Sequence, residues 1–142
     1  KLRLATAESC TGGLIAGCLT AVAGSSSVFD RGFVTYSNTA KTAELGVPAE
    51  LLARKGAVNE PVARAMAEGA LAAAGTDVTV AVTGIAGPDG GGPGKPVGLV
   101  YFAAARNGAE TLAERHVFAG DRQQVRAATV EAALHLLLRR LD

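Results

Sequence analysis

The run DVTVAVTG at residues 77–84 decides the fold class of this chain. In a strand with one solvent-exposed face, apolar and polar residues alternate, and they do so too little here. The run is therefore typical of a central strand covered on both sides. A strand follows from the apolar-rich residues 2–8, and another from residues 31–36. Residues 98–106 and 111–119 flank Asn107-Gly108, a strong turn signal, and predict a hairpin. The sequence therefore predicts an α/β fold with a mixed, mostly parallel sheet of about five strands.

Helices are predicted between and after these strands, so that both faces of the sheet are covered. Residues 14–22 follow the first strand, residues 39–45 follow a cap at Ser37 or Asn38, and a short helix begins at Pro48. Asn59 caps a long helix that Gly75 ends, and the last helix begins at Asp121. Apolar residues repeat at helical spacing at Leu14, Ile15, Cys18, Leu19 and Val22 and line one face at Val62, Met66, Ala70 and Ala73. In the last helix the spacing predicts a buried stripe of Val130, Ala133, Leu134, Leu137, Leu138 and Leu141.

Length and composition indicate one globular domain spanning residues 1–142. Hydrophobic residues make up 49% of the chain and charged residues 19%. The formal net charge of +1 does not favour nucleic acid or an anionic membrane as a partner. Cys10 and Cys18 lack the spacing of a metal site or a disulfide framework, so we expect no metal and a reducing, cytoplasmic location. No apolar run approaches the roughly 20 residues that a membrane helix needs.

Ser9 stands where the first strand ends and a turn leads into a helix. Backbone N–H groups at a helix start can hold an oxyanion or a phosphate, and Gly12 and Gly13 would let a ligand approach the backbone. The alternative is that Ser9 or Thr11 only caps the helix. Cys10 is a rival nucleophile, but it is more typical of a small core residue.

A serine nucleophile needs a base, and Lys41 with Tyr36 is the better choice in this chain. Lys41 lies among apolar neighbours, where a lysine can be neutral enough to accept a proton. His116 and His135 lie in the returning hairpin strand and in the last helix, away from any turn signal. The alternative for Lys41 is an ordinary solvated lysine.

Two further features suggest ligand contacts. Thr83, Gly84 and Gly87 begin a loop rich in glycine and proline after the buried strand, where open α/β sheets bind ligands, although a mobile connection is equally compatible. Arg122 and Arg126 lie one turn apart at the start of the last helix, where an anion such as phosphate would offset their unfavourable position in the helix dipole. Pairing with a carboxylate such as Glu131 is the alternative.

Four separated stretches of the sequence resemble one known family: TAESCTGG at 6–13, VTYSNTAK at 34–41, VTGIAGPDGGGPGKPVGLVYFA at 82–103 and FAGDRQQVR at 118–126. In this order they are similar to the C-terminal domain of the CinA proteins, a family that includes the stand-alone deamidase PncC. The resemblance covers almost the whole chain.

This resemblance implies a three-layer α/β/α sandwich, often dimeric, that hydrolyses nicotinamide mononucleotide (NMN) to nicotinic acid mononucleotide and ammonia in pyridine nucleotide salvage, without metal or cofactor. By the same likeness Ser9 would be the nucleophile, and Lys41 and Tyr36 its base and hydroxyl partner. Thr83 and one of the two arginines, with Arg122 favoured, would contact substrate. Family members carry a helix before the first strand, whereas this sequence opens almost on the strand, which leaves fusion to an N-terminal CinA domain open.

Two other functions remain compatible with the same residues. One is a non-catalytic nucleotide-binding or phosphate-binding module in which Ser9 only caps the helix, and the other is an amidase for a different small amide. For the catalytic reading, Lys41→Ala is expected to lower turnover by orders of magnitude and to leave the thermal midpoint nearly unchanged.

Overall fold

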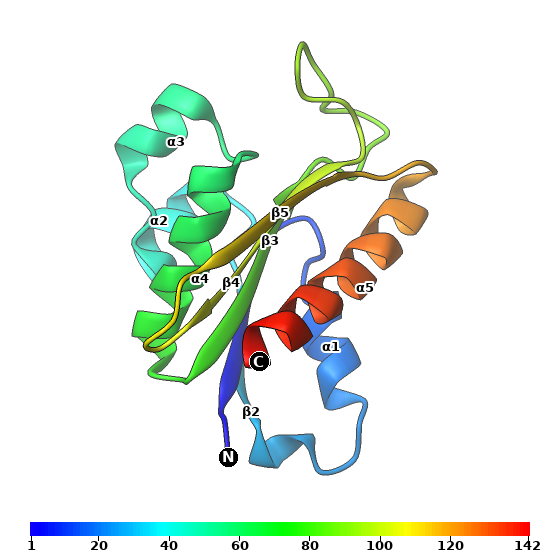
Figure 1. The fold of residues 1–142 in the computed structure, drawn as a ribbon. Coiled ribbons are helices and arrows are strands. Elements are labelled where there is room, and N and C mark those ends of the chain that lie inside the picture. Colours follow the sequence, from blue (N-terminus) through cyan, green and yellow to red (C-terminus); the bar gives the residue numbers. More distant parts are fainter.

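The computed structural model describes all of residues 1–142 and contains one five-stranded sheet (Figure 1). Its strands are β1 (Leu4–Glu8), β2 (Phe29–Val34), β3 (Val78–Gly84), β4 (Leu99–Arg106) and β5 (Leu112–Val117). Their order across the sheet is β2-β1-β3-β4-β5. β1 is parallel to β2 and to β3, and β4 is antiparallel to β3 and to β5. Only β4 therefore runs against the others, which confirms the predicted mixed, mostly parallel sheet.

Helices cover both faces of this sheet, which makes the fold a three-layer α/β/α sandwich (Figure 1). The helices are α1 (Leu14–Thr20), α2 (Asn38–Leu45), α3 (Ala49–Lys55), α4 (Glu60–Ala74) and α5 (Arg122–Leu141), with a short 3₁₀ turn at Ser25–Ser27. In Figure 1, α2, α3 and α4 lie on one side of the sheet, and α1 and α5 lie on the other. No helix of the chain combines the length and the apolarity needed to cross a bilayer.

The pleat of β3 sorts its side chains between two separate cores. Val78, Val80 and Val82 pack in the core beneath α1 and α5. Ala81 packs in the core beneath α4. Successive residues of a strand point to opposite faces, so a strand buried on both sides needs the nearly continuous apolar run that predicted it.

The predicted caps account for where the helices begin. The side chains of Ser37 and Asn59 accept hydrogen bonds from the third backbone N–H beyond them, at the starts of α2 and α4. The Asp121 side chain does the same for α5, and the Gln124 side chain accepts a hydrogen bond from the backbone N–H of Asp121. Gly75 ends α4 at φ 67°, a left-handed conformation that glycine adopts without strain.

Several predicted details are wrong at the edges of elements. Strand β2 starts and ends two residues before the predicted 31–36, because the chain leaves the sheet after Val34 and turns its next carbonyls toward α2. Helix α1 ends at Thr20, two residues before the predicted end, and Leu14, Cys18 and Val22 of its apolar repeat are exposed. A helix this short rests on the sheet mainly through Ile15.

The predicted stripes of the two long helices are confirmed at most positions and wrong at two, Ala73 and Leu138. Val62, Met66 and Ala70 are buried on α4, and on α5 Val130, Leu134 and Leu141 are partly buried against the core beside Ala133 and Leu137. On α5 the buried residues are Val125, Thr129, Ala133, Leu136 and Leu137. Leu138 is 61% exposed, because a rotation of about 100° per residue takes it away from the face that Leu137 buries. On α4, Ala73 is exposed and Ala74 is half-buried. The buried face that contains Met66 and Ala70 recurs every four residues, so it continues at position 74 rather than at 73.

Candidate active site

The site forms where β1 ends, between the sheet and α2. Ser9 directly follows β1, and its backbone N–H donates to the carbonyl of Val82 on β3 at 3.2 Å. Lys41 projects from α2, and its Nζ lies 2.9 Å from Ser9 Oγ. Both side chains are buried, and Lys41 is only 1% exposed. The parallel pairing of β1 with β2 brings the two together, because it delivers the start of α2 next to the end of β1.

The Lys41 amine sits in a setting that suits a proton acceptor. Burial lowers its pKa, which the nearby Cys10 thiol opposes to a lesser degree. Nζ also lies 2.8 Å from the carbonyl oxygen of Thr35 and 3.3 Å from that of Tyr36. A neutral amine has two N–H groups and one lone pair. With two N–H groups donated to the two carbonyls, the lone pair is left for the Ser9 hydroxyl.

The side chains of consecutive residues at the end of β1 point to opposite faces of the sheet. Ser9 meets α2, whereas Glu8 before it and Cys10 after it lie toward α1 and α5. Burial raises the pKa of the Cys10 thiol to about 11, so the thiol stays protonated at neutral pH. A protonated thiol is a poor nucleophile, which favours Ser9 over the cysteine beside it.

Three of the predicted ligand positions instead form hydrogen bonds that hold the turn: Thr11, Gly12 and Gly13. The Thr11 hydroxyl and the Gly13 N–H donate to the Glu8 carboxylate, and the Gly12 N–H donates to the carbonyl of Ser9. The glycines have φ values of 58° and 111°, which let the chain reverse from strand to helix. The backbone N–H groups of Cys10 and Thr11 donate to no other group of the chain.

A cavity of about 200 Å³ lies over the Ser9–Lys41 pair. Predicted site residues among those that line it are Ser9, Tyr36, Lys41, Thr83, Gly84 and Arg122. Cys10, Asn38, Ala57, Val58 and Ala86 complete the lining. The Thr83 hydroxyl donates to the carbonyl of Ala57 at 2.9 Å, which joins the end of β3 to the segment before α4.

The two arginines at the start of α5 have different surroundings. Arg122 lines the cavity and donates to the carbonyl of Gly87 at 2.7 Å and to the hydroxyl of Tyr36 at 3.1 Å. Arg126 donates to the carbonyls of Cys10 and Thr11, each at 3.1 Å, and does not line the cavity. The structure thus pairs Arg126 with the backbone of the turn rather than with a carboxylate such as Glu131.

Tyr36 and Gly87 also differ in position from their predicted roles. The backbone carbonyl of Tyr36 contacts the Lys41 amine, whereas its hydroxyl contacts Arg122 at the mouth of the cavity. Gly87 does not line the cavity, but its carbonyl anchors Arg122. Its φ of 85° and the closeness of Val97, whose Cγ1 would lie 2.5 Å from an added Cβ, leave no room for another residue.

Sequence reasoning named neither Glu8 nor Asn38 as a residue of the site, and it considered Asn38 only as a helix cap. Glu8 is fully buried beside Ser9 and accepts four hydrogen bonds from the turn and from α1. An acidic residue just before a helix start was the available signal, because a carboxylate there is favoured by the helix dipole. Asn38 gave no comparable signal, because only the packing of α2 over the cavity brings it there.

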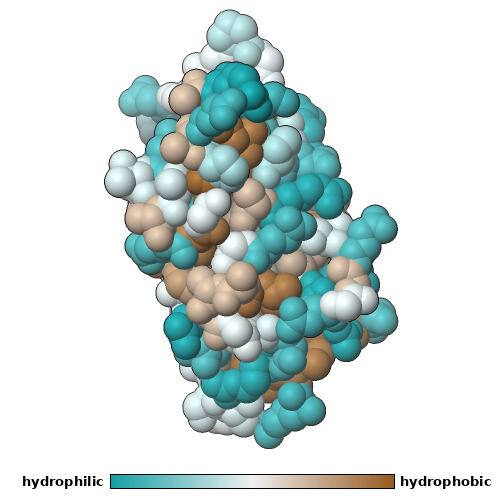
Figure 2. All heavy atoms as spheres, turned by 90° about the vertical axis from the view of Figure 1, so that its left-hand side faces the viewer, coloured by the Kyte–Doolittle hydropathy of each residue, from teal (hydrophilic) through white to brown (hydrophobic).

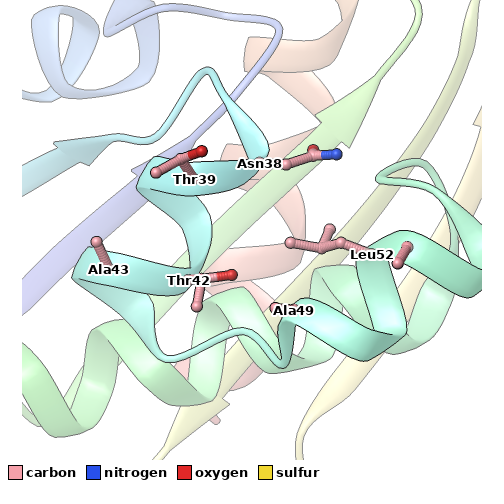
Figure 3. Close-up of a pocket in the computed structure, with 7 residues that line it drawn as sticks. Asn38, Thr39, Thr42, Ala43, Ala49 and Leu52 are labelled. Carbon is pink, nitrogen blue, oxygen red and sulfur yellow. The ribbon is translucent and has the colours of Figure 1, made fainter.

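Two other hollows lie away from the Ser9–Lys41 pair. A groove of about 460 Å³ runs between α2 and α3, and Figure 3 shows its small and uncharged lining. It is lined by Asn38, Thr39, Thr42, Ala43, Ala49, Leu52 and Ala53, none of which has a titratable side chain that could act as a general base. Figure 2 shows this face of the molecule, where hydrophobic and near-neutral residues lie among hydrophilic ones. His116 and His135 line a third hollow of about 350 Å³, between β5 and α5.

Comparison with solved structures supports the fold at high similarity. The competence/damage inducible protein of Agrobacterium tumefaciens superposes with a TM-score of 0.97 at 50% identity, covering 99% of this chain and 86% of that one. A CinA superfamily protein of Escherichia coli superposes with a TM-score of 0.92 at 44% identity, covering 96% of this chain and 79% of that one.

Comparison with curated proteins points the same way. A CinA-like protein of Citrifermentans bemidjiense is 59% identical over 140 residues, which are 99% of this chain and 34% of that protein. The chain thus spans about a third of the length of this and similar relatives. The nicotinamide-nucleotide amidohydrolase PncC of Pseudomonas putida is 54% identical over 136 residues, covering 96% of this chain and 84% of that protein. The family model described as the CinA C-terminal domain matches residues 1–141, so this chain belongs to the CinA C-terminal domain family.

Proposed function

We propose that this domain hydrolyses the carboxamide of NMN to nicotinic acid mononucleotide and ammonia, a reaction of pyridine nucleotide salvage, with Ser9 as nucleophile and Lys41 as general base. The observation that carries the proposal is the buried contact of 2.9 Å between Lys41 Nζ and Ser9 Oγ, inside a cavity that Arg122 also lines. The name of the Pseudomonas putida relative supports the choice of substrate.

In the first half of the reaction the neutral Lys41 amine accepts the hydroxyl proton as Ser9 Oγ attacks the carboxamide carbon. The electron pair of the carbonyl moves onto its oxygen, which gives a tetrahedral intermediate. When the carbon–nitrogen bond breaks, the Lys41 ammonium returns its proton to the departing nitrogen, and ammonia leaves. The acyl group remains on Ser9 as an ester.

The oxyanion of this intermediate needs hydrogen-bond donors that no other group uses. The N–H groups of Cys10 and Thr11 are unused in the turn that follows Ser9, and we assign this role to them. The sequence pointed to the N–H groups of residues 11–13, and of these only that of Thr11 is kept, because the N–H groups of Gly12 and Gly13 already donate to Ser9 and Glu8.

The second half of the reaction repeats the proton transfers with water. Lys41 accepts a proton as water attacks the ester carbon, and it then protonates Ser9 Oγ as the carbon–oxygen bond to serine breaks. The products are the free acid and the original serine. The scheme uses no metal and no cofactor.

Arg122 is our candidate for the phosphate of the substrate. It lines the cavity from the start of α5, and its guanidinium is already held by Gly87 and Tyr36. The start of α1 is a poor alternative, because its N–H groups donate to Glu8 and a second anion there would be repelled. Tyr36 then acts through its hydroxyl on Arg122, and Thr83 shapes the wall of the cavity.

Ammonia release from NMN by purified wild type, Ser9→Ala and Ser27→Ala tests this function. Ser27 is an exposed serine in the 3₁₀ turn, so Ser27→Ala is the matched control and should keep wild-type turnover. Ser9→Ala should lower kcat by at least about a thousandfold while NMN still binds. Binding of NMN without turnover by the wild type would favour a binding module, and turnover of other amides alone would favour a different amidase.

A further inference from the structure

Glu8 is the only acidic side chain among the buried residues of the chain, and it immediately precedes the proposed nucleophile. It makes no ion pair, because no lysine, arginine or histidine lies within salt-bridge distance of it. A buried carboxylate without a cation must be compensated by hydrogen bonds, so its partners identify what it does.

All four partners of Glu8 belong to the turn and to the first residues of α1. Oε1 accepts from the Thr11 hydroxyl at 2.5 Å, from the Gly13 N–H at 3.2 Å and from the Ile15 N–H at 2.9 Å. Oε2 accepts from the Ala16 N–H at 3.0 Å. The N-cap of α1 is Gly13, which has no side chain to supply a cap, so Glu8 supplies it from the strand.

The remaining contacts of the turn hold its backbone. The Ser9 N–H is bonded to β3, the Gly12 N–H is bonded to the Ser9 carbonyl, and Arg126 donates to the carbonyls of Cys10 and Thr11. Only Glu8 connects the end of β1 to α1 by side-chain hydrogen bonds. Removing it would free the turn relative to the helix while leaving Lys41 in place on the opposite face.

We propose that Glu8 is a positioning residue, whose carboxylate fixes the turn at residues 9–13 so that the Ser9 hydroxyl is presented to Lys41. The proposal rests on the proposed function in taking Ser9 as the nucleophile. A displacement of about 1 Å at a reacting group can cost on the order of a hundredfold in rate, so loss of this contact should appear in kcat rather than in KM.

Thr11→Val and Thr79→Val form a matched pair for the test. Both threonines are fully buried, and each donates one hydroxyl hydrogen bond, Thr11 to Glu8 and Thr79 to the carbonyl of Ala67 on α4. Thr79 lies in β3 outside the cavity, so its variant controls for lost stability alone. Thr11→Ser keeps the hydroxyl and serves as the rescue variant, and Glu8→Gln removes the charge at nearly constant volume.

Two assays are run on each variant. Ammonia release from NMN gives kcat and KM, and mass spectrometry follows the rate at which phenylmethylsulfonyl fluoride labels Ser9. We expect Thr11→Val to lower kcat and labelling by about tenfold and Glu8→Gln by about a hundredfold, with KM within about twofold. Thr11→Ser should restore both rates, and Thr79→Val should keep both near wild type.

Equal rates for Thr11→Val and Thr79→Val would overturn the role of Glu8, even if Glu8→Gln fails to fold. Labelling of wild-type Ser9 without NMN turnover would refute the proposed substrate and leave the labelling rates to decide on Glu8. If wild-type Ser9 is neither labelled nor required for turnover, the positioning role falls together with the nucleophile.

Discussion

Replacing Lys41 with methionine is the sharpest test of the proposed chemistry. Methionine keeps most of the buried volume of the lysine stem and removes the amine, which contacts Ser9, Thr35 and Tyr36. Loss of a general base costs about 10²–10⁴-fold in rate. We expect kcat to fall by about a thousandfold, which corresponds to about 4 kcal/mol of transition-state stabilisation.

Alanine at the same position would give a less clear result than the sequence alone suggests. Because Lys41 is only 1% exposed, Lys41→Ala removes three buried methylene groups. At about 0.8 kcal/mol for each methylene group, the loss is about 2.4 kcal/mol. For a chain of this size that lowers the thermal midpoint by about 7 °C, so we no longer expect an unchanged midpoint.

The assay is ammonia release from NMN by Lys41→Met and Lys41→Arg, each with a thermal melt to establish the folded fraction. Arginine keeps a positive charge but cannot lose its proton near neutral pH, so Lys41→Arg should not restore turnover. A folded Lys41→Met protein with kcat within tenfold of wild type would refute the general-base role. Restoration by arginine would show instead that the residue acts as a fixed cation.

Arg122→Gln should raise KM for NMN by about 10–100-fold with little change in kcat, because a hydrogen bond to a charged group contributes about 1.5–3 kcal/mol. An unchanged KM in steady-state kinetics would contradict the role of Arg122 in binding phosphate. Because burial lowers the pKa of Lys41, the fraction of neutral amine grows as pH rises through that value, so kcat/KM should rise with pH and level off below the usual lysine range. A profile measured from pH 6 to 10 that falls over this span would oppose the assignment. Gly84→Ala would place a Cβ 2.7 Å from Val100 Cγ2 and should lower the free energy of unfolding, measured by chemical denaturation, by about 1–3 kcal/mol. An unchanged denaturation midpoint would mean that β4 shifts without strain.

The sequence predicted the layers and the strand directions because both depend on local patterns. The doubly buried run at 77–84 implied helices on both faces, and Asn107-Gly108 implied the antiparallel return. The ends of elements were less predictable, as the shift of β2 shows. Its last pairing residue is Val34, because the carbonyls of Thr35 and Tyr36 lie against the Lys41 amine, a contact that depends on the fold of α2.

For the site, sequence patterns identified the residues more readily than their partners. Helical spacing places Arg122 and Arg126 one turn apart, but it does not say which of them faces the cavity. That depends on contacts across more than a hundred residues, from Arg126 to the carbonyls of Cys10 and Thr11. The same limit applies to Glu8, whose partners follow it closely in sequence but converge on it only because α1 folds back over the end of β1.

The alternation of side chains at the end of β1 makes the spacing of this strand unusually intolerant of length changes. Deleting one residue from Leu4–Glu8 while the upstream part of the strand keeps its pairing would turn Ser9 toward α1 and would bring Cys10 toward the amine of Lys41 on α2. We therefore expect a one-residue insertion or deletion within this strand to abolish activity even where the sheet still forms.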